Sequence, residues 1–244
     1  MTITMSYSAA SAPSARAIAE ASDGKIELVS YGLADINWGR AGTSTAQRLN
    51  NDISTCTNKR QMREMFSERG VPAPPLFSAS EAYEAISVGP LVGRPDRHTR
   101  GKGFWLCRNT DDVVRALRGT RRKAAATHFM LFVNAPREFR VHVFDGKSIR
   151  ISMKEYVTVE GAPAWKRNYL TVKPPEGFKR KPLREAAKAA IAAVGLDFGA
   201  VDILVADDGA VFVLEVNAAP GLGGSIPRVW ADTFVKHFAD REES

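Results

Sequence analysis

Two acidic side chains and one amide side chain lie close to a predicted turn near the C-terminus. Asp202 precedes the Asp-Gly pair at 208–209, and Glu215 and Asn217 follow that pair. Asp-Gly between two apolar runs predicts a β-hairpin with a two-residue turn. Counting back from the turn places Asp202 directly opposite Glu215, with Asn217 on the same face of its strand. Three oxygen ligands are therefore expected to converge.

The residues around these side chains are apolar on both faces, so both strands are expected to be largely buried. Two unpaired carboxylates there repel each other by roughly 4 kcal/mol at ~4 Å and an effective dielectric of 20. A divalent cation removes the repulsion, and oxygen ligands without His or Cys favour Mg²⁺ or Mn²⁺. The alternative is that the acids pair with Arg or Lys from elsewhere, the commoner arrangement for a single buried acid. The spacing of all three groups favours the metal.

The basic loop at 97–103 is a second candidate, because it contains Arg100, Lys102 and two glycines. Such a loop offers backbone freedom and cations to phosphate oxygens. It is neither a Walker A motif nor a dinucleotide fingerprint, and taken alone it is more often a solvated hairpin tip. The same alternative of a solvated face applies to the other charged candidates, which are Lys59, Arg94, Glu138, Arg140 and Lys154.

Amphipathic patterns predict the helices that support these segments. Residues 58–69 have apolar side chains at helical spacing, and a capping box at 78–81 predicts a short second helix. Thr110 is expected to cap a third helix that ends at Gly119. A fourth helix is expected over residues 183–195.

Two further hairpins are predicted between these helices. Residues 91–94 and 103–106 are expected to pair on either side of the basic loop. The second hairpin turns at 145–147, and a three-residue loop gives the register in which apolar residues face apolar residues. The expected pairs are Phe139–Met153, Val141–Ile151 and Val143–Ile149 on the core face, and Glu138–Lys154, Arg140–Ser152 and His142–Arg150 on a charged face.

The N-terminal region carries the weakest patterns. Residues 1–24 are small and polar and predict a disordered tail, because they offer little apolar surface to bury. Residues 26–29 are expected to form a short strand, and residues 31–51 have no clear period and are interpreted as irregular. Trp38 and Trp230 stand alone in their segments and are interpreted as exposed contact surfaces.

Composition limits the class of protein. A chain of 244 residues suffices for one sizeable core or two compact lobes with a cleft. No apolar run approaches the ~20 residues of a membrane helix, and no secretory signal is recognised, so the cytoplasm is expected. Cys56 and Cys107 have no partners at metal-ligand spacing, which argues against zinc and disulfides. The net charge of +7 favours acidic partners such as nucleotides, nucleic acid or an acidic polypeptide.

The order of four stretches resembles the ATP-grasp superfamily, particularly its RimK-like carboxylate-amine ligases and short phage-encoded relatives. The resemblance covers most of residues 50–222, and its last stretch is the most specific. The four stretches are Asn58-Lys59 with Gly70–Pro74, Val92–Arg94 with His98–Gly103, Arg137–Phe144, and Leu196–Asp202 with Leu214–Leu222.

The resemblance implies an α+β fold in which two lobes with antiparallel sheets clasp ATP and the N-terminal domain is reduced. A larger N-terminal domain in the family helps to shape the acceptor site, so a partner chain is one way to complete that site. The oligomeric state stays open, with a homodimer among the alternatives. The expected division is a disordered tail at 1–24, a reduced N-terminal region at 25–57, a central lobe with a phosphate lid at 58–128 and a C-terminal lobe with the magnesium site at 129–244.

The resemblance also implies roles for single residues. Lys59 and Arg94 contact the ATP phosphates, with Arg94 where the family often has lysine. The loop with Arg100 and Lys102 closes over the phosphates, and Glu138 binds the ribose. An apolar slot with backbone hydrogen bonds for adenine is formed by Met130, Leu131, Phe132 and Val133. Magnesium is held by Asp202, Glu215 and Asn217, and the γ-phosphate and acyl phosphate are steadied by Arg140, Lys154, Arg167 and Asn168.

The implied function is an ATP-dependent carboxylate-amine ligase that forms an amide through an acyl phosphate. One alternative is a kinase or other acid-activating enzyme of the same fold. Another is a nucleic-acid-binding protein with a vestigial ATP site. The predicted metal trio and the lack of an aromatic stacking motif argue against nucleic acid. The substrates are a small-molecule or peptide carboxylate and an amine, with an acidic substrate favoured by the basic cleft.

Overall fold

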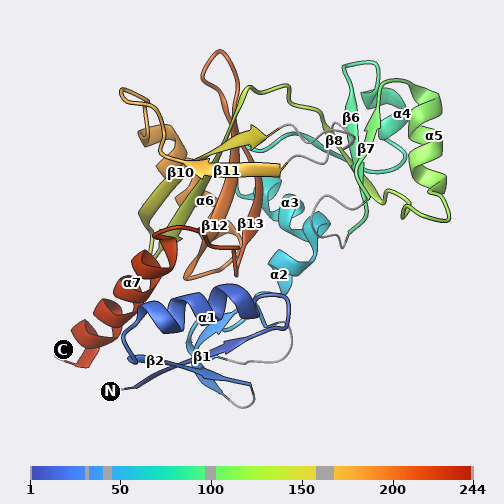
Figure 1. Cartoon of the computed structure of the whole chain (residues 1–244). Helices are drawn as coiled ribbons and strands as arrows, with labels where there is room; N and C mark the ends of the chain where they lie inside the picture. Colours follow the sequence, from blue (N-terminus) through green and yellow to red (C-terminus); the bar gives the residue numbers. More distant parts are fainter. Residues whose placement is uncertain (1, 31–32, 41–45, 97–102, 158–167, 243–244) are drawn as a thin grey trace.

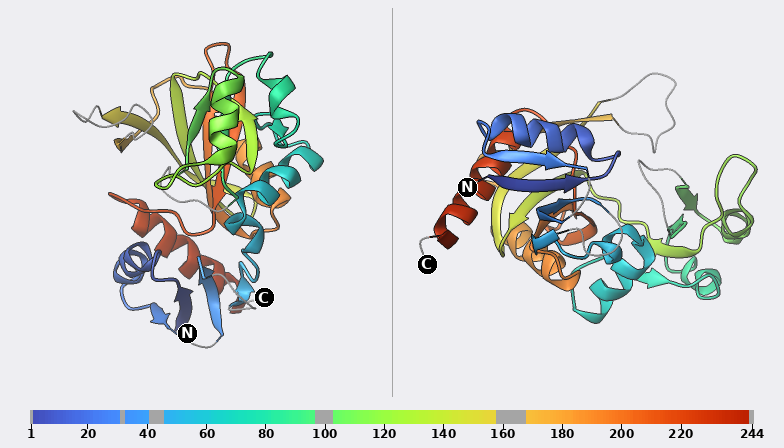
Figure 2. Two further views of the ribbon diagram at one scale, coloured as in Figure 1. Left: turned by 90° about the vertical axis from the view of Figure 1, so that its right-hand side faces the viewer. Right: turned by 90° about the horizontal axis from the view of Figure 1, so that it is seen from below.

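Figure 1 shows the computed structural model of the chain, which describes residues 2–30, 33–40, 46–96, 103–157 and 168–242. Within these ranges, three sheets of four, five and four strands are linked by helices. The N-terminal sheet lies at one end of the molecule, the five-stranded sheet in the middle and the second four-stranded sheet at the other end (Figures 1 and 2). No helix in the described ranges is long and apolar enough to cross a membrane.

The N-terminal region forms a parallel sheet covered by helix α1 (Ala12–Ala21). The prediction of disorder is therefore wrong for residues 2–24, and residues 31–51 include two strands instead of being irregular throughout. Composition misled here because Ile3, Met5 and Ile18 find their apolar partners on helix α7 (Ile226–Glu242), at the other end of the sequence. The strands in spatial order are β2 (Ile26–Val29), which the sequence predicts, then β1 (Ile3–Tyr7), β3 (Ala34–Trp38) and β4 (Ala46–Leu49).

Trp38 and Trp230 are wholly buried in the same core, so their interpretation as exposed contact surfaces is wrong. The two indoles meet edge to face with ring centroids 5.4 Å apart. The serines of the α1 segment act as partners for Trp38: Ser11 Oγ donates to the Trp38 carbonyl at 2.7 Å, and Trp38 Nε1 donates to Ser14 Oγ at 2.8 Å. Small polar residues thus satisfy the indole N–H and leave space for its ring.

Helices α2 (Ser54–Thr57) and α3 (Lys59–Glu68) link the N-terminal sheet to the rest of the chain. Helix α3 coincides with the predicted helix at 58–69. The Asn58 side chain accepts a hydrogen bond from the Gln61 N–H and caps its start. Met62 and Phe66, on its apolar face, are wholly buried.

The second four-stranded sheet is antiparallel and carries two helices. The predicted hairpin is confirmed between β6 (Leu91–Arg94) and β7 (Trp105–Cys107). The capping box is confirmed by reciprocal hydrogen bonds between Ser78 and Glu81. Asn109 caps the next helix, so the prediction of Thr110 is one residue late. Asn and Thr are both common N-cap residues, and Asn109 and Thr110 are adjacent, so residue type alone did not identify the cap. The elements are β5 (Leu76–Phe77), β8 (His128–Leu131), β6 (Leu91–Arg94) and β7 (Trp105–Cys107) in spatial order, with α4 (Ala82–Ala85) and α5 (Thr110–Arg118).

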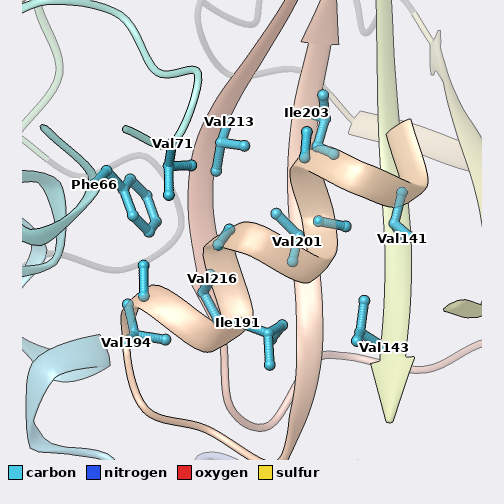
Figure 3. Packing of buried hydrophobic residues seen from close by; sticks show 14 of the residues in the cluster. Phe66, Val71, Val141, Val143, Ile191, Val194, Val201, Ile203, Val213 and Val216 are labelled. Carbon is cyan, nitrogen blue, oxygen red and sulfur yellow. The ribbon is translucent and has the colours of Figure 1, made fainter. Parts of the chain in front are cut away.

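The five-stranded sheet is antiparallel throughout and forms the main core with helix α6 (Lys181–Ala193). Figure 3 shows Ile191 and Val194 of this helix over Val201 and Val216 of the sheet, with Phe66 of α3 closing one side. The opposite face of the sheet packs against α7 through Phe144 and Phe198. The strands in spatial order are β11 (Asn168–Val172), β10 (Lys147–Val157), β9 (Arg137–Phe144), β12 (Phe198–Val205) and β13 (Val211–Asn217).

The β9–β10 hairpin reaches the predicted register by a different route. Its loop has two residues, Asp145 and Gly146, because Phe144 pairs with Lys147. An irregularity between Ser148 and Arg150 then inserts one extra residue, and from Arg150 onward every pair is the predicted one. The predicted pairs Glu138–Lys154, Arg140–Ser152, His142–Arg150, Val141–Ile151 and Phe139–Met153 are confirmed, whereas Val143–Ile149 is wrong, since Val143 pairs with Ser148.

The β12–β13 hairpin also regains the predicted register through one irregularity in the pairing. Its loop is one residue longer than predicted, whereas the β9–β10 loop is one residue shorter. Ala206 and Ala210 are hydrogen-bonded across a loop of three residues, so the predicted two-residue turn is wrong. A register shift between Asp202 and Ile203 then restores the predicted pairing of Asp202 with Glu215. The two acids are therefore brought together as the sequence predicts.

Candidate functional site

Eight charged residues gather where the five-stranded sheet, α3 and the end of β6 meet. We call them the charged cluster, and they comprise Lys59, Arg63, Arg94, Glu138, Arg140, Lys154, Asp202 and Glu215. Five are cations and three are carboxylates. Seven of the eight, all except Arg63, belong to the sequence-predicted nucleotide and metal positions or their charged strand face, so the fold does bring those positions together.

Asp202 on β12 is held by two cations, one on the neighbouring strand β9 and one on the next strand, β10. Arg140 on β9 is its register partner and donates from Nε to Oδ1 at 2.8 Å and from Nη2 to Oδ2 at 2.9 Å. Lys154 Nζ on β10 lies 2.9 Å from Oδ2. Burial alone raises the pKa of this carboxyl, but Arg140 and then Lys154 outweigh burial and hold the pKa well below its usual range.

Glu138 on β9 is bound by two side chains of β10. Lys154 bonds to one of its carboxylate oxygens, and the Tyr156 hydroxyl donates to the other. Burial disfavours the ammonium of Lys154, but Asp202 and Glu138 outweigh burial and raise its pKa above the usual value. Lys154 therefore stays protonated between two carboxylates.

Glu215 lies opposite Asp202 and pairs with a different cation. Lys59 Nζ is 3.5 Å from its Oε2 and 3.3 Å from the Val216 carbonyl, to which it donates. Asn217 Nδ2 donates to Glu215 Oε1 at 3.2 Å, so these two side chains of β13 point to the same place. Burial raises the pKa of Glu215, but the attraction of Lys59 prevails, and the pKa is lowered.

The three predicted metal ligands fit a divalent cation unequally. Glu215 and Asn217 offer hard oxygens two residues apart on one strand face, which suits Mg²⁺. Both oxygens of Asp202 are engaged by Arg140 and Lys154, and this is the ion-paired alternative that the sequence also allows. Among the described residues, no group of three or more His, Cys, Asp or Glu side chains is arranged to hold a metal. Two of the three ligands thus fit, and the third must exchange its partners.

Two cations of the charged cluster are buried arginines. Arg63 and Arg94 are only 7% and 9% exposed, respectively. Burial lowers the pKa of each to about 10, and the carboxylate of Glu215 offsets burial only in part. Arg63 donates to the carbonyls of Lys59 and Leu214 at 3.2 and 3.1 Å. Among the described residues, the charged cluster contains more cations than carboxylates, which favours the binding of an anion.

The predicted adenine segment lies where β8 leaves the second sheet. Met130 is buried and pairs with Leu76 and Val92 on either side. The N–H groups of Leu131 and Phe132 donate to the carbonyls of Pro75 and Pro90 at 3.2 and 2.8 Å. These two amides are therefore engaged within the protein and do not offer the predicted backbone hydrogen bonds to adenine.

Four predicted positions are not placed as side chains. Arg100, Lys102 and Arg167 lie outside the described residues. The Asn168 backbone pairs with Val157 at the start of β11, while its side chain is not among those described.

Two residues of the site were not predicted from the sequence. Arg63 lies one helical turn after Lys59, and the (i, i+4) spacing was the available signal for a second buried cation. Tyr156 lies two residues after Lys154 on the same strand face, so strand alternation could have found it.

No protein-family model matches the chain. Two curated relatives are D-alanine–D-alanine ligases. The protein from Methylacidiphilum infernorum is 24% identical over 176 residues, which are 68% of this chain and 56% of the relative. The protein from Citrifermentans bemidjiense is 27% identical over 167 residues, which are 65% of this chain and 54% of the relative. The chain thus spans about half the length of the curated relatives it matches.

Solved structures show the same arrangement of elements at low identity. D-alanine–D-alanine ligase from Bacillus anthracis has a TM-score of 0.68 at 15% identity, over 96% of this chain and 93% of that chain. The ATP-grasp ligase PsnB complexed with minimal precursor has a TM-score of 0.70 at 13% identity, over 96% and 99%. N5-carboxyaminoimidazole synthetase from Staphylococcus aureus complexed with ADP has 0.67 at 13%, over 92% and 73%. The chain therefore has the ATP-grasp fold.

Proposed function

We propose that the protein is an ATP-dependent carboxylate-amine ligase whose charged cluster holds the phosphates of ATP. The observation that carries the proposal is the composition of the charged cluster, in which the described residues supply five cations and three carboxylates where two antiparallel sheets meet. The nucleotide-bound neighbours of the same fold, such as the synthetase complexed with ADP, support the choice of anion. RimK-like character belongs to the proposal as well.

Nucleotide binding is proposed to proceed by exchange of ion pairs. Without a ligand, Arg140 and Lys154 neutralise Asp202, and Lys59 neutralises Glu215. Phosphate oxygens compete for these cations because charge-assisted hydrogen bonds to phosphate are strong. The carboxylates released in this way, together with Asn217, would hold Mg²⁺, which supplies further neutralisation of phosphate charge.

The proposed reaction has two steps in which atoms balance. A substrate carboxylate oxygen attacks the γ-phosphorus of ATP, and ADP leaves. An amine nitrogen then attacks the acyl carbon, inorganic phosphate leaves, and the nitrogen loses a proton. Arg140 and Lys154 would stabilise the transferred phosphoryl group, in company with Arg167 and Asn168, so catalysis rests on positioning and charge. No nucleophile from the protein is needed.

The substrate carboxylate and amine belong to small molecules or to a peptide. PsnB, which has the same fold, is described in complex with a precursor peptide. The net positive charge of +7 favours an acidic substrate here.

The first test is nucleotide binding by isothermal titration calorimetry. Wild-type protein should bind ADP in the presence of Mg²⁺. The Arg94→Met and Lys59→Met variants should bind at least about tenfold more weakly, because each loses one charge-assisted contact of about 1.4 kcal/mol or more. Arg118→Met, an exposed cation on α5, is the matched control and should bind as wild type. Equal affinity in all four proteins counts against the proposal.

Metal binding can be followed without turnover by the electron paramagnetic resonance of Mn²⁺ in the presence of ADP. Glu215→Gln and Asn217→Ala should each weaken Mn²⁺ binding, whereas Glu176→Gln, an exposed acid outside the cluster, should leave it unchanged. Unchanged Mn²⁺ binding in both site variants would remove these residues from the metal site.

Product analysis separates the ligase from its alternatives. ATP, Mg²⁺ and pooled amino acids or peptides should yield ADP, phosphate and an amide. A phosphorylated product without an amide would identify a kinase or another acid-activating enzyme. Steeply salt-dependent DNA binding without ADP affinity would instead identify a nucleic-acid-binding protein.

A further inference from the structure

Two adjoining cavities lie away from the charged cluster, at the side of the five-stranded sheet where α6 begins. Their volumes are about 440 and 490 Å³, and they share Ser148 and Arg184 in their walls. The first is bounded by the β9–β10 turn and α6. The second lies along residues 148–151 of β10 and the segment that leads into α6.

The walls of these cavities are strongly cationic. Seven Lys or Arg side chains line them, against two glutamates. The ion pair recorded among these residues joins Lys181 and Glu185 at 3.9 Å, and both side chains are largely exposed. Most of the cations that the structure describes here thus face the cavities without a carboxylate partner in the wall.

The start of α6 adds to this positive field. Arg180 is its N-terminal cap residue, no side chain caps the helix, and its first turn contains no acid. A helix N-terminus carries a partial positive charge that favours anions, yet here Lys181 and Arg184 lie beside it. The fold therefore places cations where a helix is stabilised by negative charge.

The second cavity also borders an open strand edge. β9 pairs with residues 147–154 of β10, whereas β11 pairs only with residues 153–157 of β10. Within the described residues, no strand pairs with 148–152 on the side away from β9. Arg150 and Ile151 point to opposite faces of the sheet, yet both line the cavity, so the cavity straddles the edge itself.

We propose that this edge is a docking site for an extended acidic peptide segment of a partner. The peptide would add to the sheet along residues 148–152 in line with β11, with main-chain hydrogen bonds to the open edge. Its carboxylates would meet Arg150 on one side and Arg180 and Arg184 on the other. Ile149, Ile151 and Pro174 would contact its apolar side chains.

The chemistry of the site favours a peptide over nucleic acid. An open strand edge presents N–H and C=O groups at the spacing of another polypeptide. Neither cavity has an aromatic side chain in its wall, whereas single-stranded nucleic acids are held by stacking on aromatic rings. The inference goes beyond the proposed ligase and does not depend on it, since docking requires neither ATP nor metal.

The test is fluorescence anisotropy with a labelled short peptide of alternating glutamate and valine, without nucleotide. Two further peptides carry N-methyl groups, one on the valines and the other on the glutamates. Adding a strand uses the N–H groups of alternate residues, so one methylated peptide should lose binding and the other should keep it. Equal binding of all three peptides, or no binding of the unmodified one at low salt, would overturn the proposal.

The matched variants reverse charge at exposed positions. Arg180→Glu/Arg184→Glu should weaken peptide binding at least about tenfold and should slightly raise the melting temperature, because acids suit a helix N-terminus. Arg118→Glu/Arg121→Glu makes the same change in net charge elsewhere and should leave binding within about twofold of wild type. Equal losses in both double variants would mean a general charge effect and would overturn the site. Tighter binding of a single-stranded oligonucleotide that depends on Arg180 and Arg184 would overturn the peptide assignment.

Discussion

Arg140 engages both carboxylate oxygens of Asp202 across two neighbouring strands, at 2.8 and 2.9 Å. Both side chains are largely buried, with 14% and 5% of their surfaces exposed. Replacing Arg140 by Met leaves the buried carboxylate with Lys154 alone. We expect a loss of about 3–5 kcal/mol in the free energy of unfolding, measured by urea denaturation.

The double variant Arg140→Met/Asp202→Asn is the control, because it removes both charges of the pair. It should recover part of the lost stability. A single variant that unfolds at the same urea concentration as the wild type would contradict the ion pair.

Buried histidines predict a loss of stability in mild acid. Burial, followed by repulsion from cations, lowers the pKa of His128 to about 4 and that of His142 to about 3. The unfolded chain, with a pKa near 6.5, binds more protons as the pH falls below that value, so stability must fall. At pH 5 each histidine costs about 2 kcal/mol relative to pH 7.

Urea denaturation at pH 7 and pH 5 measures this effect. His142 Nδ1 accepts from Trp230 Nε1 at 3.1 Å, and glutamine in its place retains an acceptor without titrating. His142→Gln should therefore lose less stability between the two pH values than the wild type. Asp202, with its lowered pKa, contributes its full stabilisation above its unfolded value of about 3.9 and loses it only below that pH, so this contribution is nearly constant between pH 7 and pH 5. An identical pH dependence in both proteins would refute the assignment.

Trp38 predicts the strength of the N-terminal core. It is wholly buried and packs on Phe198 at 5.6 Å as well as on Trp230. Trp38→Ala should cost about 3–5 kcal/mol in the free energy of unfolding. Tyr83→Ala, at a position that is 46% exposed, should change it by less than about 0.5 kcal/mol. Similar small effects of both substitutions would show that the indole does not hold this core together.

The β9–β10 turn predicts a purely conformational effect. Gly146 has φ +64°, and a Cβ there would meet nothing within 4 Å. Gly146→Ala should therefore cost about 1–2 kcal/mol through the left-handed backbone alone. Gly223, which has equal space but no positive φ, is the control, and Gly223→Ala should be neutral or slightly stabilising. Thermal unfolding of the two variants compares them directly.

The pairing of Asp202 with Glu215 was predictable because strand alternation and burial select one register. The loops were not, since each hairpin reaches that register through one compensating extra residue, Ile149 in one and Leu214 in the other. A single-residue irregularity leaves no period in the sequence. The site end of each hairpin was thus easier to predict than its turn.

The N-terminal sheet was not predictable from local composition. Ser11 and Ser14 look like residues of a polar tail until Trp38 supplies their hydrogen-bond partners. The ion pairs of Asp202 were likewise hidden, because they depend on which strand lies beside β12, and this order is set by the whole sheet. The types of the charged residues indicated the site. Which of these residues pair with one another could be assigned only from the three-dimensional structure.

The core shared by β1 and α7 has a consequence for biosynthesis. The ribosome releases β1 long before it releases α7, the helix that covers its core. Contacts so distant along the chain form slowly, because a long loop must close first. The apolar side chains of the nascent N-terminal sheet that pack on α7 therefore stay uncovered until α7 has emerged.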